Sequence, residues 1–438
     1  MGAYLLDWVA LFFRWFHVIA GVAWIGASFY FVWLDMSLQK PPEWKAKKGI
    51  SGDLWAVHGG GFYEIAKYKL DPEEMPKTLH WFKWEAYTTW LTGAAMMAIV
   101  YYANATAYLI DPSKVDFGSN IGAIATSILF LLVTYAIYEG VVRSRIGKNK
   151  MTFSITIFVL MVVAAWASYQ LFSDRASFIH VGAILGTIMA GNVFFGIMPA
   201  QRALVDCVRK GEKPGPEVQD LALMARNRSL MNNYFTLPLI FTMISNHYPM
   251  MYSHAQGWLV LVFVGIITAT ARHYFNQKHL GHKKPQYLWI PALATVMLII
   301  FMRPAPIEPL PVPPVAAAQP VTDVAPTDAP PAGEAVAGGA VVAPAAGAAA
   351  AAVPVTASAD DAIMGVVQAK CSVCHMAQPT QAGFNAPPAG IIIQTPEDMK
   401  NYKAKIVTAV QSKYMPLGNI TNLSDDERAQ IVAYASGL

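Results

Sequence analysis

The chain has 438 residues, of which 55% are hydrophobic and 14% are charged, and its mean hydropathy is positive. This composition is typical of a polytopic membrane protein and argues against a soluble globular one. The formal net charge of +4 follows from where the basic loops fall and does not indicate a nucleic-acid partner.

Long apolar runs predict eight transmembrane helices. Most of the runs can cross a hydrocarbon layer of about 30 Å as helices, and tryptophan and tyrosine, which favour membrane interfaces, are plentiful. The runs are 8–34, 88–110, 120–142, 151–172, 177–199, 234–250, 257–275 and 286–302. No signal peptide is expected, because the first run lacks a basic leading segment and contains Arg14.

Lysine and arginine are distributed unevenly among the loops between these runs. The basic loops are 35–87, 143–150, 200–233 and 272–287, which hold 8, 4, 6 and 4 of these residues. The alternate loops hold only Lys114 and Arg175. Because basic loops remain in the cytoplasm, the sequence predicts a multi-pass protein with both termini outside.

Two of the apolar runs carry a histidine in a similar setting. The stretches WFHVIAGVAWIGASFYF and FIHVGAILGTIMAGNVFF share H-V-x-A at an offset of 163 residues, which suggests two four-helix halves. A histidine inside a membrane is costly unless it has a partner or a function. His17 and His180 are therefore candidate ligands of a b-type haem, with nearby glycines leaving room for a flat ring. The alternative is that each histidine forms a hydrogen bond across a helix interface.

Polar residues also gather on the predicted cytoplasmic side. The stretch WAVHGGGFYEIAKYKL predicts two short strands around a glycine turn, with His58 at the tip. The stretch LHWFKWEAYTTW places His80 and Glu85 at the inner surface, and NRSLMNNYFTLPL places Asn232 and Asn233 there. Interface anchoring and helix capping account for most of these residues, but tandem amides also pair well with the edge of a heteroaromatic ring.

A segment rich in proline, alanine and glycine, 304–358, predicts an extended and largely disordered linker. It divides the chain into a membrane domain, 1–303, and a C-terminal domain, 359–438. The linker would hold the second domain at high effective concentration near the outer membrane face.

The C-terminal domain contains a C-x-x-C-H motif made of Cys371, Cys374 and His375. This motif is the attachment signature of a c-type haem, with two thiols for the vinyl groups and a histidine for the iron. A zinc site would need two more ligands, and Cys207 lies in a distant cytoplasmic loop. A redox dithiol would not require the histidine. A c-type haem is attached on the outer side of a bacterial inner membrane, which agrees with the topology that the basic loops predict, so the termini are expected in the periplasm.

Helices are predicted around this motif. One runs into it, a second begins after the N-cap Thr395, and a third opens with a capping box of Ser424 and Glu427. Pro416 stops a helix, so Met415 is expected in a loop as the second axial ligand of the haem iron. The domain is similar to a small class I cytochrome c, and the fold class of the chain is all-α.

Four stretches, HVIAGVAWIGASFYFVWLD, HGGGFYE, HWFKWEAYTTWLTG and NNYFTLPLIFTMISNHYP, precede the C-x-x-C-H domain. Together they resemble the membrane-bound urate oxidase (urate hydroxylase) family over nearly the whole chain. The resemblance implies an eight-helix membrane region fused to a cytochrome c domain that carries one covalent haem c. It implies oxidation of urate to 5-hydroxyisourate, with electrons passed onward to a soluble or membrane cytochrome c or to a terminal oxidase.

The resemblance assigns no urate-binding residue, so the candidates come from chemistry. A planar urate anion needs a cation, amides, an aromatic face and a base. The candidates that supply these groups are Arg14, Trp24, His58, His80, Glu85, Asn232 and Asn233. Two other functions fit the same residues, namely a haem-bearing subunit that relays electrons from quinol to cytochrome and a transporter with an appended cytochrome.

Overall fold

The computed structural model describes residues 2–72, 75–111, 114–252, 254, 256–303, 359–381, 387–388, 391–411 and 413–438. This part of the chain is mostly helical and contains one two-stranded sheet. The predicted linker, 304–358, lies outside the described residues, and the predicted division into domains stays a prediction.

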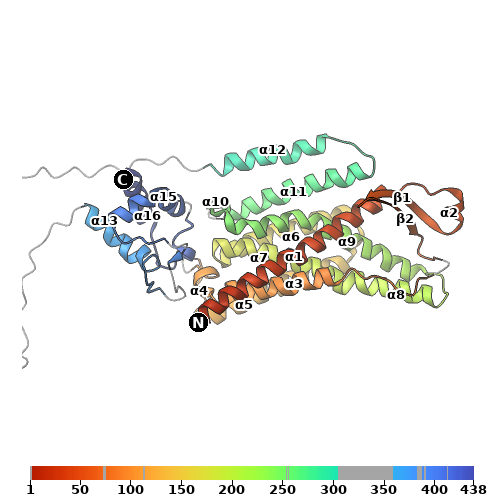
Figure 1. Ribbon diagram of the computed structural model, residues 1–438, viewed down its shortest axis with the longest axis horizontal. Helices are drawn as coiled ribbons and strands as arrows, with labels where there is room; N and C mark the ends of the chain where they lie inside the picture. Colours follow the sequence, from red (N-terminus) through yellow and green to blue (C-terminus); the bar gives the residue numbers. More distant parts are fainter. Residues whose placement is uncertain are drawn as a thin grey trace, which may run out of the picture.

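Five helical segments are long and apolar enough to cross a membrane. They are α1 (Gly2–Ser37), α5 (Asn120–Arg143), α6 (Lys150–Leu171), α11 (Gly257–His279) and the continuous segment Asp174–Arg209. That last segment consists of α7 (Asp174–Gly191), the π-helical turn η3 (Asn192–Ile197) and α8 (Met198–Arg209). Figure 1 shows these helices lying roughly along the long axis of the molecule.

The other three predicted runs are also helical, but each falls short of a clean apolar span. The run 88–110 is divided among α3 (Trp84–Met96), the π-helical turn η1 (Met97–Tyr102) and α4 (Ala105–Tyr108). The run 234–250 is the second half of α9 (Pro216–Ile244), whose first half is polar, followed by η4 (Ser245–His247) and α10 (Pro249–Tyr252). The last run is α12 (Gln286–Phe301), an apolar helix whose 16 residues make it shorter than the five candidate spans. The described structure thus supports five of the eight predicted spans.

The bundle packs around α7, which is the most deeply buried of its helices. Phe178, Ile184 and Ile188 of this helix are almost completely buried in the main hydrophobic core. Two glycines let its neighbours approach closely, since Gly182 faces Thr242 of α9 and Gly191 faces the Tyr135 ring of α5, with no space for a larger side chain. Small residues at helix interfaces are a common feature of membrane bundles.

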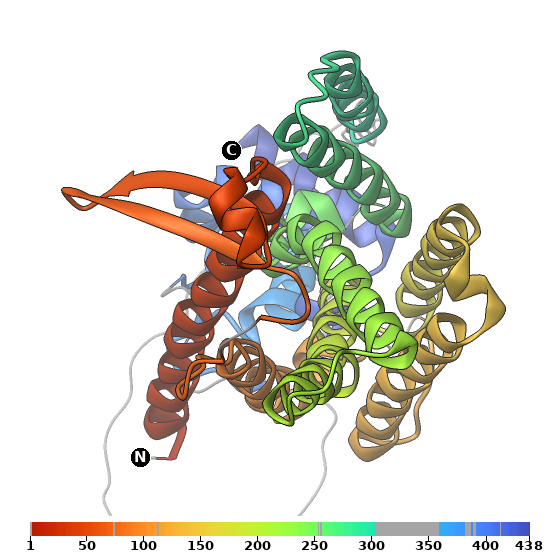
Figure 2. The ribbon, with the colours of Figure 1, turned by 90° about the vertical axis from the view of Figure 1, so that its right-hand side faces the viewer.

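A β-hairpin follows α1 and α2 (Glu43–Lys47), as the glycine turn predicts. Strand β1 (Ile50–His58) pairs with β2 (Gly61–Tyr68) in antiparallel register, and His58 stands opposite Gly61 at the tip. Gly59 and Gly60 form the turn with positive φ angles, which glycine adopts at little cost. Figure 2 shows the hairpin projecting sideways from the helical bundle.

The C-terminal helices pack around a hydrophobic core of their own, at the end of the molecule opposite the hairpin (Figure 1). They are α13 (Ala359–Val367), η5 (Gln368–Ser372), α14 (Pro396–Asn401), α15 (Lys403–Gln411), η7 (Leu417–Asn419) and α16 (Asp425–Gly437). The predicted N-cap Thr395 and the predicted capping box of Ser424 and Glu427 are confirmed. Met364 and Met399 are buried in this core.

The C-terminal helices contact one end of the bundle through η7 and α4. The backbone of Gly418 lies so close to the Ile110 carbonyl that an added Cβ would come within 3.0 Å of its oxygen. Beside this contact the rings of Tyr414 and Tyr252 meet edge to face, with centroids 6.4 Å apart. The contact brings the C-x-x-C-H region next to the start of α7.

Candidate functional site

The C-x-x-C-H residues line a large pocket in the C-terminal helices. Cys371 lies in the π-helical turn η5, and Cys374 and His375 follow directly. The pocket has a volume of about 940 Å³ and an apolar lining that includes Ile393 and Met399. A volume and lining of this kind suit a large, mostly apolar ligand.

His375 is held in one orientation with one nitrogen left over. Its Nδ1 lies 2.9 Å from the Ile391 carbonyl oxygen and donates a hydrogen bond to it, which leaves Nε2 available to a ligand. Burial lowers the pKa of His375, so its imidazole is neutral near pH 7. Burial also raises the pKa of Cys371, to about 11, so this thiol is protonated when nothing is bonded to it.

Met415 lines the same pocket from the loop before η7, where the sequence places it. Arg428 of α16 holds this loop, because its guanidinium donates to the Met415 carbonyl (2.6 Å) and to Asn419 Oδ1 (2.9 Å). Two thiols, a free imidazole nitrogen and a thioether around one apolar pocket are the donor set that a c-type haem requires. These residues therefore fit such a haem.

The same pocket is also lined by residues of the bundle, including Tyr108, Arg175 and His247. The pocket therefore faces the bundle as well as the C-terminal helices. No cluster of three or more His, Cys, Asp or Glu side chains suited to a metal ion occurs in the part of the chain that the structure describes.

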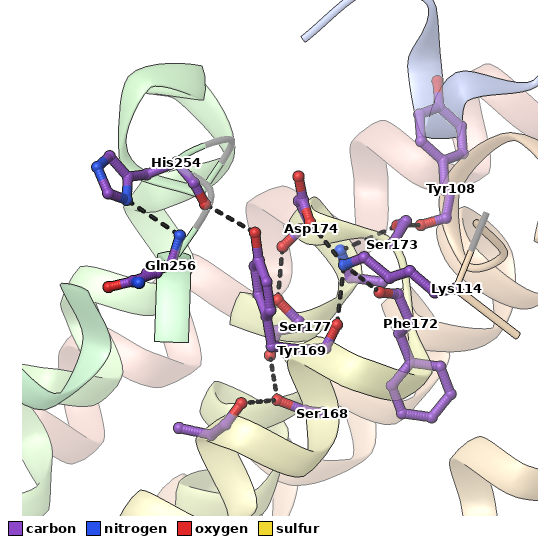
Figure 3. Close-up of polar contacts among 12 residues, drawn as sticks. Tyr108, Lys114, Ser168, Tyr169, Phe172, Ser173, Asp174, Ser177, His254 and Gln256 are labelled. Carbon is purple, nitrogen blue, oxygen red and sulfur yellow. Dashed lines mark hydrogen bonds and ion pairs between the residues drawn. The ribbon is translucent and has the colours of Figure 1, made fainter. Parts of the chain in front are cut away.

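A polar cluster around Lys114 fixes the end of the bundle that faces this pocket (Figure 3). The Lys114 ammonium donates to Asp174 (2.6 Å) and to the backbone carbonyls of Tyr169 (2.8 Å) and Phe172 (3.0 Å). Ser173 donates to the Tyr108 carbonyl at 2.7 Å. The turn between α6 and α7 is thereby tied to α4, and Arg175 follows directly after it.

His180 has no nitrogen left for an iron ion. It is completely buried, its Nδ1 lies 2.7 Å from the Ala176 carbonyl, and its Nε2 lies 2.6 Å from the Ser127 hydroxyl. The Phe172 ring stacks on the imidazole with centroids 4.0 Å apart. The interhelical hydrogen-bond alternative describes this histidine, and the surroundings of His180 do not fit a b-type haem.

His17 also forms a hydrogen bond across a helix interface. Its Nδ1 lies 3.0 Å from Thr92 Oγ1 of α3, and Gly93 of that helix lies against the imidazole edge. The glycine near this histidine thus leaves room for the imidazole itself. A b-type haem at His17 stays a prediction.

The two predicted asparagines belong to different buried networks. Asn232 accepts a hydrogen bond from Asn192 (2.9 Å) and donates to the Met189 carbonyl (3.0 Å). Asn192 in turn accepts from Arg228, which forms a bidentate ion pair with Glu139 at 2.8 and 2.9 Å. Asn232 has no buried polar atom without a partner, and its role in urate binding stays a prediction.

Asn233 instead faces Arg272, a residue that sequence reasoning missed. Its Oδ1 accepts from Arg272 Nε (2.7 Å) and from Asn276 Nδ2 (3.2 Å). Arg272 is 7% exposed, its guanidinium lies 4.0 Å from the centre of the Phe29 ring, and no described carboxylate lies within ion-pair distance. The sequence placed Arg272 in a cytoplasmic loop, whereas α11 continues to His279 and buries it. The four-residue spacing between Arg272 and Asn276 places them on one face of a helix, and this spacing could have indicated from the sequence that they act together.

The remaining candidates are scattered. Arg14 is exposed in the first half of α1, and Trp24 packs partly buried against the core. His58 stands at the hairpin tip. His80 is exposed with its Nε2 4.0 Å from a Glu85 oxygen, while the other Glu85 oxygen is buried without a described partner. The structure does not gather them into one site.

A family model described as Urate oxidase N-terminal matches residues 3–303. The match covers the bundle and the hairpin and ends where the described part of the bundle ends. No curated protein and no solved structure gives a significant match to the chain.

The two arginines that pair with Glu139 offer a direct comparison. Arg228→Met should lower the free energy of unfolding by about 3 kcal/mol, because it breaks a buried ion pair and removes one of the two donors to Asn192 Oδ1. Arg143→Met should cost about 1 kcal/mol or less, since the Arg143 side chain is 67% exposed. Thermal unfolding of the two purified variants measures the difference, and equal losses would contradict the assignment of Arg228 to the core.

Proposed function

The chain belongs to the urate oxidase N-terminal family, and from that premise we propose that it oxidises urate to 5-hydroxyisourate and passes the electrons to a c-type haem. The observation that carries the proposal is the contact between the family region and the pocket lined by Cys371, Cys374 and His375. An oxidoreductase that uses an electron carrier in place of oxygen needs its oxidising site and its carrier on neighbouring surfaces.

In this proposal the protein supplies all four attachment points for the haem. The thiols of Cys371 and Cys374 would bond to the vinyl groups, while His375 Nε2 and the Met415 thioether would hold the iron. The hydrogen bond from His375 to the Ile391 carbonyl fixes the imidazole ring. When bound, the haem accepts one electron at a time and releases it to an outside acceptor.

The overall reaction balances with water as the oxygen source. Urate and one water give 5-hydroxyisourate, two protons and two electrons, with the new C–O bond at C5. Two successive one-electron transfers therefore serve each urate. The onward acceptor would be a soluble or membrane cytochrome c or a terminal oxidase of the respiratory chain.

Urate-dependent reduction of the haem tests the function. Purified protein with oxidised haem, mixed with urate under anaerobic conditions, should develop the spectrum of reduced c-type haem, with two haems reduced per urate consumed. A relay subunit without a urate site would respond to a quinol and ignore urate. Reduction by quinol alone would therefore overturn the proposal in favour of that alternative.

Met415 is expected to be the second axial ligand. Met415→Ala should keep the covalent haem but lose the sulfur–iron charge-transfer band in the far red, because the thioether is gone. Met364→Leu is the matched control, since Met364 is a buried core methionine outside the pocket lining, and it should keep the band. A band that survives Met415→Ala but disappears in Met399→Leu would move the ligand to Met399.

We also propose that the protein lies in a bacterial inner membrane with both termini and the haem pocket on the periplasmic side. The five apolar helices and the basic loops on one side of them support this placement. Reporter fusions after residue 145 should report the cytoplasm, and fusions after residue 310 should report the periplasm. Reversed signals would contradict both the charge distribution and the side on which c-type haem is attached.

A further inference from the structure

A second cavity, of about 310 Å³, lies between the bundle and the C-terminal helices. Its volume is at the lower end of the range for small-molecule sites, which suits a bicyclic ring system. Its lining combines aromatic and charged side chains from both parts of the molecule. They include Tyr108, Arg175 and Tyr252 of the bundle and Tyr414 and Arg428 of the C-terminal helices.

Arg175 gives this cavity a cation. Its guanidinium lies 4.8 Å from the centre of the Tyr108 ring, and its Nε donates to Asn246 Oδ1 at 3.1 Å. Within the described ranges no carboxylate lies at ion-pair distance from Arg175. Three carboxylates, Asp111, Asp174 and Asp425, also line the cavity. Asp174 is paired with Lys114 at 2.6 Å and Asp425 with Lys413 at 2.9 Å.

Tyr252 provides an independent sign of a missing ligand. Its side chain is 3% exposed and lines the cavity, and its hydroxyl is buried without a hydrogen-bond partner among the described residues. A buried hydroxyl that lacks a partner is destabilising. A bound molecule with a carbonyl or an N–H group at this point would satisfy it.

The small cavity adjoins the large pocket. Tyr108, Arg175, Tyr414 and Leu417 line both of them. A molecule in the small cavity would therefore lie beside a haem in the large one, so electrons would not have to cross the bundle.

The buried Arg272 is another cation that could bind the purine anion. It lies toward the opposite end of the bundle from the large pocket, which is the wrong end for electron transfer to a haem there. Gly257, at the start of α11, packs against Tyr252 and Tyr169 near the cavity. Arg272 lies about 22 Å further along that helix, at 1.5 Å per residue. The surroundings of His180 do not fit a second carrier that would span this distance, and a b-type haem at His17 stays a prediction.

We propose that the cavity between the bundle and the C-terminal helices is the urate site, with Arg175 as the cation for the purine anion and Tyr252 as a hydrogen-bond partner. This inference rests on the function proposed above and specifies where that function takes place. A c-type haem held in the adjacent pocket would take up the two electrons singly, with an outside one-electron acceptor as the oxidant. The two protons pass to water.

Urate binding can be measured apart from turnover. In protein reduced beforehand with dithionite the haem cannot accept electrons, so equilibrium dialysis with radiolabelled urate reports binding alone. Arg175→Gln should weaken binding about 10- to 100-fold, as expected for the loss of a hydrogen bond to a charged group. Tyr252→Phe should weaken it several-fold without lowering thermal stability, because the hydroxyl has no protein partner to lose.

Two further variants make the result decisive. Arg226→Gln changes an exposed arginine that pairs with Asp35 far from the cavity, and it should bind urate normally. Ascorbate reduction and the haem spectrum should be unchanged in Tyr252→Phe, Arg226→Gln and Arg272→Gln, because none of these three residues lines the large pocket. Normal binding in both Arg175→Gln and Tyr252→Phe, or a loss that appears only in Arg272→Gln, would overturn the cavity assignment while leaving urate oxidation in place. Failure of the unaltered protein to bind or oxidise urate would overturn both.

Discussion

The approach of η7 to α4 is the contact on which both cavities depend. Gly418 has a positive φ of 56° and lies against the Ile110 carbonyl, so the position favours glycine for its backbone conformation and for its lack of a side chain. This contact sets Tyr414 and Leu417 against the bundle, where they form walls of both cavities. A bulkier residue at position 418 would push the C-terminal helices away and open both cavities at once.

The opposite wall is held just as firmly by Lys114. Its three donors engage two carbonyls at the end of α6 and a carboxylate at the start of α7. Helix ends leave such carbonyls without partners, and a cation there also compensates the helix dipole. In the sequence Lys114 is simply one of two basic residues in the outer loops. In the structure it keeps the α6–α7 turn, and with it Arg175, in place.

Local features of the fold could be predicted and long-range partners could not. Helix positions, the hairpin with His58 at its tip, the caps at Thr395 and Ser424, and the loop around Met415 depend on residues close together in the chain. Five of the eight predicted spans stand out as long apolar helices among the described residues, because the π-helical turn η1 and the polar start of α9 interrupt or displace other apolar runs. Adjacent side chains on a helix point about 100° apart, which is why Asn232 and Asn233 enter separate networks. Arg175 and Arg272 are charges that the sequence counts as loop residues, and only the packed structure shows that neither has a carboxylate partner among the described residues.

The walls of the smaller cavity come from both the bundle and the C-terminal helices, so binding of a molecule there is coupled to the association of these two parts. Arg175 and Tyr252 come from one part of the molecule and Tyr414 and Arg428 from the other. A molecule that touches both parts binds their joined arrangement better than their separated one. By thermodynamic linkage, a molecule that binds only the joined arrangement stabilises that arrangement. The free energy of association becomes more favourable by about 2.7 kcal/mol when the concentration of the molecule is 100 times its dissociation constant. The bound molecule thus stabilises the association of the two parts, and its release weakens that association.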